Sequence, residues 1–344
     1  MRDRAAVPEG FRLGVTRGDA PESKASSVLR RTPRNPMSMM DTPVLFLIFN
    51  RPEPTEKIWD LLRKIRPATL RIAADGPREG RADDFRNCAE TRRIVQRIDW
   101  KCDVKYRFLE KNYGCRRAVS SAIDWFFSEF EEGIILEDDC LPHREFFSFC
   151  SAALKTYRFD ERVMHVNGTV HFAPDSAARR AWFSRYALVW GWASWRRAWA
   201  KYDPRLFRYP FDALSEVFSD AEVLARWREL LKKTADRRPG FDDTWDFQWS
   251  AALFAADGVA VSPPVNLIRN IGMESGTHEM PDGAARSAAV PRTFSAAEIT
   301  FPPASAMTDP GADARIFDMI YRKKALLSRI AGKIGKRARN GENS

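Results

Sequence analysis

The chain has 344 residues, of which 44% are hydrophobic and 30% charged, and this balance is typical of a globular protein with a sizeable core. Its net charge of +10 is concentrated at the ends: residues 1–40 carry about +4 and residues 322–344 about +7, which leaves about −1 for residues 41–321. Because a nucleic-acid-binding module carries its basic residues on the folded surface, this distribution predicts no nucleic-acid partner.

The five cysteines show no metal-ligand spacing, and the last 194 residues contain none. Such usage is typical of reduced thiols rather than of a disulfide framework or a zinc site. The sequence also has no apolar run of the roughly 18 residues that cross a bilayer, and no apolar signal-peptide core near its start. We therefore expect a cytoplasmic protein.

Strands and helices are expected to alternate through the first half of the folded region. Apolar runs predict strands over 44–49, 70–74, 104–109 and 133–136, and apolar residues at helical spacing predict helices over 54–65, 83–98, 114–130 and 145–157. Four such alternations predict an α/β fold with a Rossmann-like, mainly parallel sheet that is flanked by helices.

The second half is less regular. We expect short strands over 163–166, 259–261 and 265–268, a mostly exposed helix over 211–233, and a helix from Asp242 to about residue 256. Residues 1–40 are rich in Arg, Pro, Ser and Gly and are expected to be disordered. Methionines at 37, 39 and 40 leave open that translation starts there. Residues 281–312 are expected to form a loose linker.

Residues 313–344 are predicted to form a basic, amphipathic C-terminal helix and tail. From residue 322 to residue 339 there are eight basic residues and no acidic one. A helix of this kind can lie on an anionic membrane surface, as a peripheral contact at the inner membrane face. The alternative is a helix that packs on the domain and frays into solvent.

Three carboxylates, Glu137, Asp138 and Asp139, directly follow the fourth predicted strand. Adjacent carboxylates repel one another, and a divalent cation offsets this repulsion. Mg²⁺ and Mn²⁺ prefer oxygen ligands, often one or two carboxylates together with substrate phosphates. The triplet therefore predicts a metal site for Mn²⁺ or Mg²⁺, with a solvated acidic turn as the alternative.

Other polar residues follow the neighbouring strands, and the ends of parallel strands meet at one edge, where ligands bind. These residues are Asn50, Arg51 and Asp75. A nucleotide-diphosphate sugar is the candidate ligand, because a metal and arginines can neutralise its departing diphosphate. Arg116 lies in the first turn of a predicted helix, where anions are favoured, unless it is simply part of a solvated helix start.

Transfer of a sugar to a hydroxyl group requires a general base. Asp246 is the first candidate, followed by Asp242 and Asp243, although these residues can instead cap the helix that begins here. Trp192 can stack on a sugar ring, but clustered tryptophans are more often core residues. His278, in a predicted loop, can ligate a metal or bind phosphate.

The order of these segments resembles the GT-A-fold glycosyltransferases, above all the eukaryotic N-acetylglucosaminyltransferase I type, and bacterial glycosyltransferase-like proteins, some with a hemolytic-protein label. The resemblance extends over about residues 43–280. It rests on Asn50-Arg51, Ala74-Asp75-Gly76, Glu137-Asp138-Asp139, Trp190-Gly191-Trp192, Trp245-Asp246 and Gly276-Thr277-His278. It implies a single GT-A domain over 41–280, with a nucleotide-sugar half (41–160) and an acceptor half (161–280).

The resemblance also implies roles for the residues that bind the donor. Arg51 and Asp75 would contact the nucleotide, and Arg116 would contact the nucleotide sugar. Asp138 would touch the sugar or ribose, with Glu137 beside it, and Asp139 would bind Mn²⁺.

In the acceptor half, Asp246 matches the catalytic base of the family and Thr277 a diphosphate contact. The chain departs from the family at Asn50, where the family has Asp, and in the residues that separate Asp246 from the next tryptophan. Asp243 therefore stays open as the base.

The implied reaction is the transfer of a sugar from a UDP-sugar to a glycan hydroxyl, with inversion, in the synthesis of a cell-surface polysaccharide or glycoconjugate. A non-catalytic carbohydrate- or membrane-binding protein on the same fold is the alternative. A nucleotidyltransferase is a third possibility, but the Gly-rich phosphate loop expected of it near the N-terminus is absent.

Overall fold

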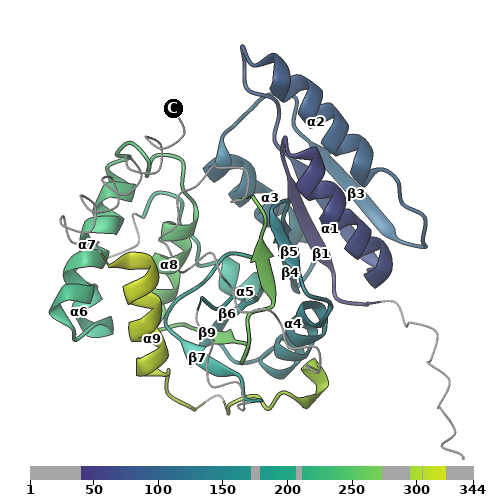
Figure 1. The fold of residues 1–344 in the computed structure, drawn as a ribbon. Helices are drawn as coiled ribbons and strands as arrows, with labels where there is room; N and C mark the ends of the chain where they lie inside the picture. Colours follow the sequence, from purple (N-terminus) through teal and green to yellow (C-terminus); the bar gives the residue numbers. More distant parts are fainter. Residues whose placement is uncertain (1–39, 172–178, 207–210, 273–294, 304, 323–344) are drawn as a thin grey trace, which may run out of the picture. The chain divides into compact units, whose positions relative to one another are not determined.

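The first half of the chain folds as its sequence predicts. The computed structural model describes residues 40–171, 179–206, 211–272, 295–303 and 305–322. The predicted strands are β1 (Val44–Ile48), β2 (Thr69–Ala74), β3 (Asp103–Phe108) and β4 (Glu132–Glu137) (Figure 1). The predicted helices are α1 (Pro52–Ile65), α2 (Ala82–Val95), α3 (Cys115–Glu129) and α4 (Arg144–Thr156).

A single large sheet forms the centre of the fold. It continues from β4 through β6 (Val163–Asn167), β7 (Trp182–Ser184), β8 (Trp192–Trp195) and β9 (Val259–Ser262), and its strand order is β3-β2-β1-β4-β8-β6-β9-β7. The first four strands in this order are parallel, β8 is antiparallel to both of its neighbours, and β6 and β9 are parallel. The predicted Rossmann-like, mainly parallel α/β sheet is confirmed.

The order of the strands sets the place of a ligand site. The chain moves outward from β1 through β2 to β3 and then returns to place β4 on the other side of β1. The strand order therefore reverses between β1 and β4. Open α/β sheets bind their ligands beyond the carboxyl ends of the strands at such a switch point.

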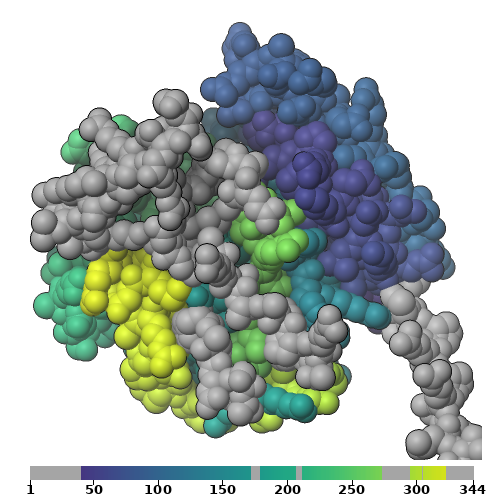
Figure 2. Space-filling model, viewed as in Figure 1, coloured from purple at the N-terminus to yellow at the C-terminus, as the bar shows by residue number. Residues whose placement is uncertain are grey.

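Alternate residues of β1 explain why helices cover both faces of the sheet. Val44, Phe46 and Ile48 pack in one hydrophobic cluster with buried residues of α1, α2 and α4. Leu45 and Leu47 point to the other face and pack in a second cluster with α3. In Figure 2, α1 (purple) and α2 (blue) form one continuous outer surface.

A short antiparallel ribbon follows the acidic triplet, and the sequence did not predict it. Its strands are β5 (Cys140–Pro142) and β10 (Ile268–Asn270), so the strand expected over 265–268 begins three residues later. The ribbon continues through the backbone N–H of Ile271, which donates to the carbonyl of Asp139 at 2.7 Å. This contact fixes the backbone of the triplet's last residue.

Two helix predictions in the second half are wrong in their extent. The helix expected over 211–233 is three elements, η1 (Phe211–Ala213), α6 (Leu214–Val217) and α7 (Ala221–Ala235), because Asp220 caps a new helix. One side of α7 is buried, including Trp227, rather than mostly exposed. The helix expected from Asp242 begins four residues later, as α8 (Asp246–Ala255), and turns precede it. The short helix α5 (Arg196–Trp199) follows β8.

Of the residues expected to form a loose linker over 281–312, the structure describes 295–303 and 305–312, and these are ordered. They include η3 (Ala296–Glu298) and the start of α9 (Pro310–Ile316), which continues directly into the short π-helix η4 (Phe317–Tyr321). The Tyr157 hydroxyl donates to the Pro302 carbonyl at 2.6 Å, and this contact anchors the segment on the domain. In Figure 2 the yellow C-terminal residues lie beside the green helices.

The last helix begins at Pro310 rather than at residue 313, because Asp309 caps it. The predictions for residues 1–39 and for the basic tail beyond Arg322 lie outside the described residues. Within the described part of the chain, every helix is too short or too polar to cross a bilayer.

Candidate functional site

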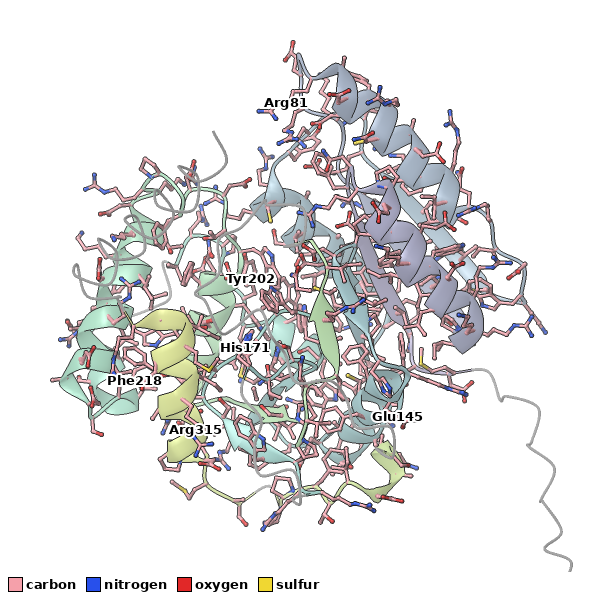
Figure 3. All side chains as sticks on the ribbon, viewed as in Figure 1. Arg81, Glu145, His171, Tyr202, Phe218 and Arg315 are labelled. Atoms are coloured by element: carbon pink, nitrogen blue, oxygen red, sulfur yellow. The ribbon has the colours of Figure 1, made fainter. Side chains whose placement is uncertain are left out.

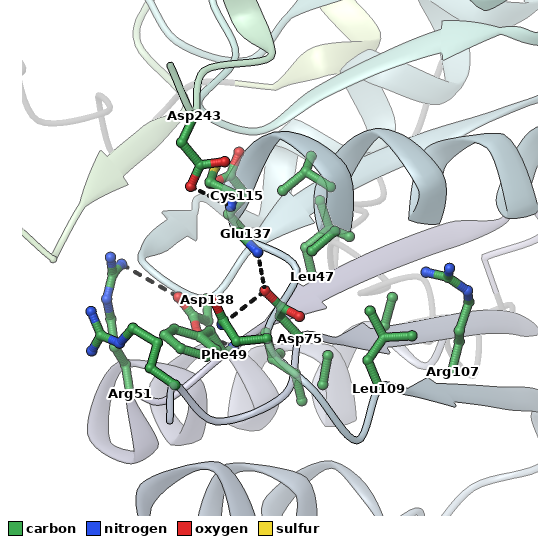
Figure 4. Close-up of a pocket in the computed structure, with 18 residues that line it drawn as sticks. Leu47, Phe49, Arg51, Asp75, Arg107, Leu109, Cys115, Glu137, Asp138 and Asp243 are labelled. Carbon is green, nitrogen blue, oxygen red and sulfur yellow. Dashed lines mark hydrogen bonds and ion pairs between the residues drawn. The ribbon is translucent and has the colours of Figure 1, made fainter. Parts of the chain in front are cut away.

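A cavity of about 310 Å³ lies at the switch point between β1 and β4. We call it the switch-point cavity. It is lined by residues at the carboxyl ends of the four parallel strands β1 to β4 and at the start of α3 (Figure 4). Its floor is apolar and includes Leu47, Ala73 and Ala118, while Arg51 and Arg107 lie at its opposite ends. The predicted edge of the sheet is therefore hollowed, with charged groups around an apolar floor.

The acidic triplet and Arg51 meet at this cavity. The Arg51 guanidinium lies 2.5 Å from Asp139 Oδ2 and 3.4 Å from Asp138 Oδ1. The other oxygen of Asp138 accepts a hydrogen bond from the backbone N–H of Phe49 at 2.8 Å. The segments that follow the carboxyl ends of β1 and β4 are thus joined by charged hydrogen bonds.

The triplet places three carboxyl groups beside one arginine, Arg51. Burial raises the pKa of Glu137 to about 8, and repulsion from Asp139 and Asp138 contributes to the rise. Burial likewise raises the pKa of Asp138 to about 7, although Arg51 opposes the change. Glu137 accepts no hydrogen bond from the described residues and lines the cavity. Positive charge would stabilise this group of carboxylates.

The part of the chain that the structure describes contains no set of three or more His, Cys, Asp or Glu side chains that could hold a metal by itself. A hard cation such as Mg²⁺ needs only one or two protein carboxylates when substrate phosphates complete its shell. The oxygen donors of Glu137 and Asp139 fit this kind of shared site, because a bound cation would favour the ionised form of the carboxyl groups. In donor type and charge the residues could hold Mn²⁺ or Mg²⁺.

Asp75 lines the cavity but is already saturated with hydrogen bonds. Its carboxylate accepts from the backbone N–H groups of Gly76, Tyr113 and Gly114 and from the Asn112 side chain, all within 3.2 Å. Burial raises the pKa of Asp75, and the backbone hydrogen bonds oppose the rise. Asp75 therefore holds the loop between β3 and α3 in place at the cavity edge.

Asn50 does not line the cavity. Its side-chain amide donates to Asp84 Oδ1 at 2.7 Å, and Asp84 also accepts from the Arg78 guanidinium at 2.5 and 2.9 Å. These bonds, from Arg78 above all, lower the pKa of Asp84 to about 2. Asp84 thus ties the loop after β1 to the loop after β2 and places Arg78 over the Phe49 ring. Neither Asp84 nor Arg78 was predicted as a site residue.

The N-terminus of α3 is capped by the carboxylate of Asp243, a residue far away in the sequence. Asp243 accepts hydrogen bonds from the backbone N–H groups of Cys115 at 2.8 Å and Arg116 at 2.9 Å. This helix N-terminus is therefore occupied by the protein's own anion, and the phosphate site expected there is not available. The Arg116 side chain does not line the switch-point cavity but a second, smaller one.

Asp246 is the first residue of α8. Its negative charge contributes to the raised pKa of Glu137, which places it close to the acidic triplet. Burial raises the pKa of Asp246 itself. Among the candidate bases, Asp246 is thus near the triplet, while both oxygens of Asp243 are used in capping.

Trp192 is a core residue. Its side chain is fully buried, stacks on His165 with ring centroids 4.9 Å apart, and packs against Trp245. The interpretation of Trp192 as a wall for a sugar is therefore wrong, because no ligand can reach it. The predicted site residues Thr277 and His278 lie outside the described residues.

Comparisons with known proteins assign no family. No protein-family model and no curated protein matches the chain. Among solved structures, one that matches is UDP-glucose pyrophosphorylase complexed with UDP-glucose, at 7% sequence identity and a TM-score of 0.35. The match covers 72% of this chain and 97% of that chain. At this distance the likeness identifies neither the activity nor the ligand of this protein.

Proposed function

We propose that this protein is a metal-dependent glycosyltransferase of the GT-A kind. It would move a sugar from a nucleotide-diphosphate sugar, UDP-linked, to a hydroxyl of a glycan acceptor, with inversion, in cell-surface glycan synthesis. The observation that supports this most is the switch-point cavity: Arg51, Glu137 and Asp138 line it beside an apolar floor, and Arg51 is also paired with Asp139.

The switch-point cavity has an apolar region and a charged region, and a nucleotide diphosphate needs both, for its base and for its phosphates. The floor around Leu47, Ala73 and Ala118 suits a planar base. The charged side chains Arg51 and Arg78, which also line the cavity, suit the diphosphate. Because Asp243 occupies the start of α3, these guanidinium groups supply the positive charge that the helix terminus does not.

Asp139, with Glu137 beside it, would hold Mn²⁺ or Mg²⁺, and the bound cation would neutralise charge on the diphosphate leaving group. Arg51 would then be shared between the triplet and the phosphates. The two carboxylates bring oxygen donors and negative charge to the end of β4, and the backbone contact from Ile271 holds Asp139 in position.

Asp246 would be the general base. It would accept the proton of the acceptor hydroxyl while the hydroxyl oxygen forms a bond to the anomeric carbon. The bond between that carbon and the phosphate oxygen would break on the opposite side, and UDP would leave with the electron pair. Attack from the face opposite the leaving group inverts the anomeric configuration. The acceptor would approach from the side of α8, where Asp246 lies near the triplet.

A thermal-shift assay with UDP and MnCl₂, followed by a screen for hydrolysis of UDP-sugars, tests the proposal. We expect UDP and Mn²⁺ together to stabilise the protein more than either alone. Asp139→Ala should remove the joint effect and the metal-dependent turnover, whereas Asp83→Ala, at an exposed residue of α2, should change neither. Joint stabilisation without turnover of any UDP-sugar would favour the non-catalytic alternative, and no stabilisation would contradict the proposal.

A further inference from the structure

A second cavity, of about 140 Å³, lies beside the start of α3 and is surrounded by arginines. We call it the arginine cavity. Arg116, Arg205 and Arg237 line it, together with small and apolar residues that include Leu206 and Ala235. The three arginines come from three separate segments: α3, the loop after α5, and the turn after α7. The fold therefore brings together three positive charges that are far apart in the sequence.

No carboxylate lines the arginine cavity. The guanidinium groups of Arg116 and Arg237 form no hydrogen bond or ion pair with another described residue. Two acids are next to lining residues in the chain. Asp203 accepts a hydrogen bond from the backbone N–H of Arg205 at 3.0 Å, and Asp236 Oδ2 lies 3.4 Å from Lys232 Nζ and 3.9 Å from Arg238 Nε. The positive charges of Arg116 and Arg237 are therefore not compensated by the described residues.

The arginine cavity lies next to the proposed reaction site. Cys115 lines the switch-point cavity and the following residue, Arg116, lines the arginine cavity. Asp243 holds the backbone of both residues, so the two cavities share one fixed turn of α3.

Tyr202, labelled in Figure 3, is close enough to Arg116 and Asp246 for both charges to act on its hydroxyl group. Burial raises the pKa of its hydroxyl, Arg116 opposes the rise and Asp246 contributes to it. Arg116 and the proposed base are thus both within electrostatic range of one hydroxyl group. A molecule that extends from Asp246 toward Arg116 would have its reacting end near the acidic triplet and its other end at the arginine cavity.

We propose that the arginine cavity binds an oxyanion, a carboxylate or a phosphate, carried by the acceptor glycan. The substrate class would then be an acidic glycan such as one that contains uronic acid or sugar phosphate. Arginine suits this role because its planar guanidinium group donates paired hydrogen bonds to carboxylate and phosphate oxygens and keeps its charge at all working pH values. The assignment to the acceptor rests on the proposed function.

Saturation-transfer NMR with simple sugars tests the inference. D-glucuronate and D-glucose differ at carbon 6, carboxylate against hydroxymethyl, and D-glucose 6-phosphate supplies the phosphate arm. We expect saturation transfer to glucuronate or to glucose 6-phosphate, with the stronger of the two identifying the natural anion, and none to glucose. Sulfate at matched ionic strength should suppress the signal.

Two variants, and the thermal shift with UDP and Mn²⁺, show whether the sugar signal depends on these arginines. Arg205→Gln/Arg237→Gln should lower the sugar signal at least fivefold, while Arg228→Gln, on the exposed side of α7, should leave it unchanged. The thermal shift given by UDP and Mn²⁺ should be the same in all three proteins. Equal signals from glucose and glucuronate, or a signal retained in the double variant, would overturn the inference.

Two outcomes of the nucleotide readout separate the inference from the proposed function. A UDP shift that falls in the double variant would place these arginines in the nucleotide site and refute an acceptor role. If wild-type protein binds glucuronate through the arginines but shows no shift with UDP and Mn²⁺, the oxyanion site stands, the proposed function fails, and the acceptor assignment fails with it.

Discussion

The carboxylate of Asp243 accepts a hydrogen bond from the backbone N–H of Cys115 at 2.8 Å, across 128 positions of the chain. Its other oxygen accepts from Arg116 at 2.9 Å. The residue before the helix, Gly114, has φ of +81° and carries no side chain that could cap α3. A Cβ atom at Gly114 would lie 2.8 Å from the carboxylate oxygens. The glycine and the distant aspartate thus form one cap.

The first prediction concerns stability. Asp243→Ala should lower the free energy of unfolding by about 1 kcal/mol, because two N–H groups at the start of α3 lose their acceptor. Urea denaturation measures the loss. Asp242→Ala is the matched control: Asp242 accepts one hydrogen bond, from the backbone of Gly240, and is exposed. Equal effects of the two substitutions would show that Asp243 is not a cap.

The second prediction separates the proposed base from this cap. Asp246→Asn should reduce kcat for sugar transfer roughly 10²–10⁴-fold, because the acceptor hydroxyl loses its proton acceptor. Stabilisation by UDP and Mn²⁺ should persist, because the donor binds without the base. Initial-rate kinetics with the UDP-sugar found by the hydrolysis screen provide the measurement. If Asp243→Asn reduces kcat as strongly as Asp246→Asn, the base assignment is wrong.

The first half of the fold could be predicted because its signals are local. Each strand is a continuous apolar run, and helix α3 has apolar residues at three- and four-residue intervals, so periodicity alone locates them. The position of the acidic triplet at the carboxyl end of β4 follows from the same pattern. The sequence therefore predicted the edge of the sheet at which Arg51 and Asp138 meet.

Contacts between distant side chains could not be predicted in this way. Asp84 looks like any acidic residue in the first turn of a helix, and its bonds to Asn50 and Arg78 depend on how two loops fold over α2. Asp243 caps a helix 128 positions away, whereas local reasoning assigned it to the helix that follows. Trp192 lies in β8, which pairs with β4 in the middle of the sheet. Helices and loops cover both faces of the sheet there, so Trp192 is a core residue, and the sequence near it does not show this.

The third prediction tests the Asp84 network. Asp84 is 3% exposed, and Asp84→Asn replaces a charge that holds Arg78 and Asn50. We expect a loss of about 1.5–3 kcal/mol in the free energy of unfolding, the range for hydrogen bonds to charged groups. Because Arg78 lines the switch-point cavity, the Kd for UDP should also rise several-fold.

The neighbouring aspartate supplies the control for this network. Asp83 is exposed and pairs with Arg86 within one turn of α2, so Asp83→Asn should cost less than about 1 kcal/mol and leave UDP binding unchanged. Chemical denaturation and titration calorimetry with UDP measure the two effects. A wild-type Kd in Asp84→Asn would show that Arg78 takes no part in nucleotide binding.

The fourth prediction concerns Gly272, whose backbone lies close to the side chain of Asp139. A Cβ atom at Gly272 would lie 2.7 Å from the Cβ and Oδ2 atoms of Asp139 and 3.1 Å from the Arg51 guanidinium. Gly272→Ala should therefore displace Asp139 and abolish the joint stabilisation by UDP and Mn²⁺. At Gly311 the nearest atom would be 3.4 Å away, so Gly311→Ala should keep the effect. A normal response of Gly272→Ala would mean that Asp139 is not a ligand.

The fifth prediction concerns the anchoring of α9 to β7. The carboxylate of Asp313 accepts hydrogen bonds from the Ser184 hydroxyl at 2.6 Å and from the backbone N–H of Arg185. Burial nevertheless raises the pKa of Asp313 from 3.8 to about 6; the hydrogen bonds and the Arg185 charge oppose the rise, and Asp309 adds to it. The folded protein therefore holds a proton that the unfolded chain has already lost.

This difference fixes the direction of the pH dependence. Between about pH 4 and pH 6 the folded state binds more protons at Asp313 than the unfolded state, so its contribution to stability falls as the pH rises. In the Asp313→Asn variant the asparagine side chain cannot ionise, and its amide oxygen can still accept the hydrogen bond from the Ser184 hydroxyl. The variant should match wild type near pH 4 and gain up to about 3 kcal/mol over it at pH 7. Urea denaturation of both proteins at pH 4, 5, 6 and 7 measures the gain, and a difference that is constant across these pH values would contradict a raised pKa at Asp313.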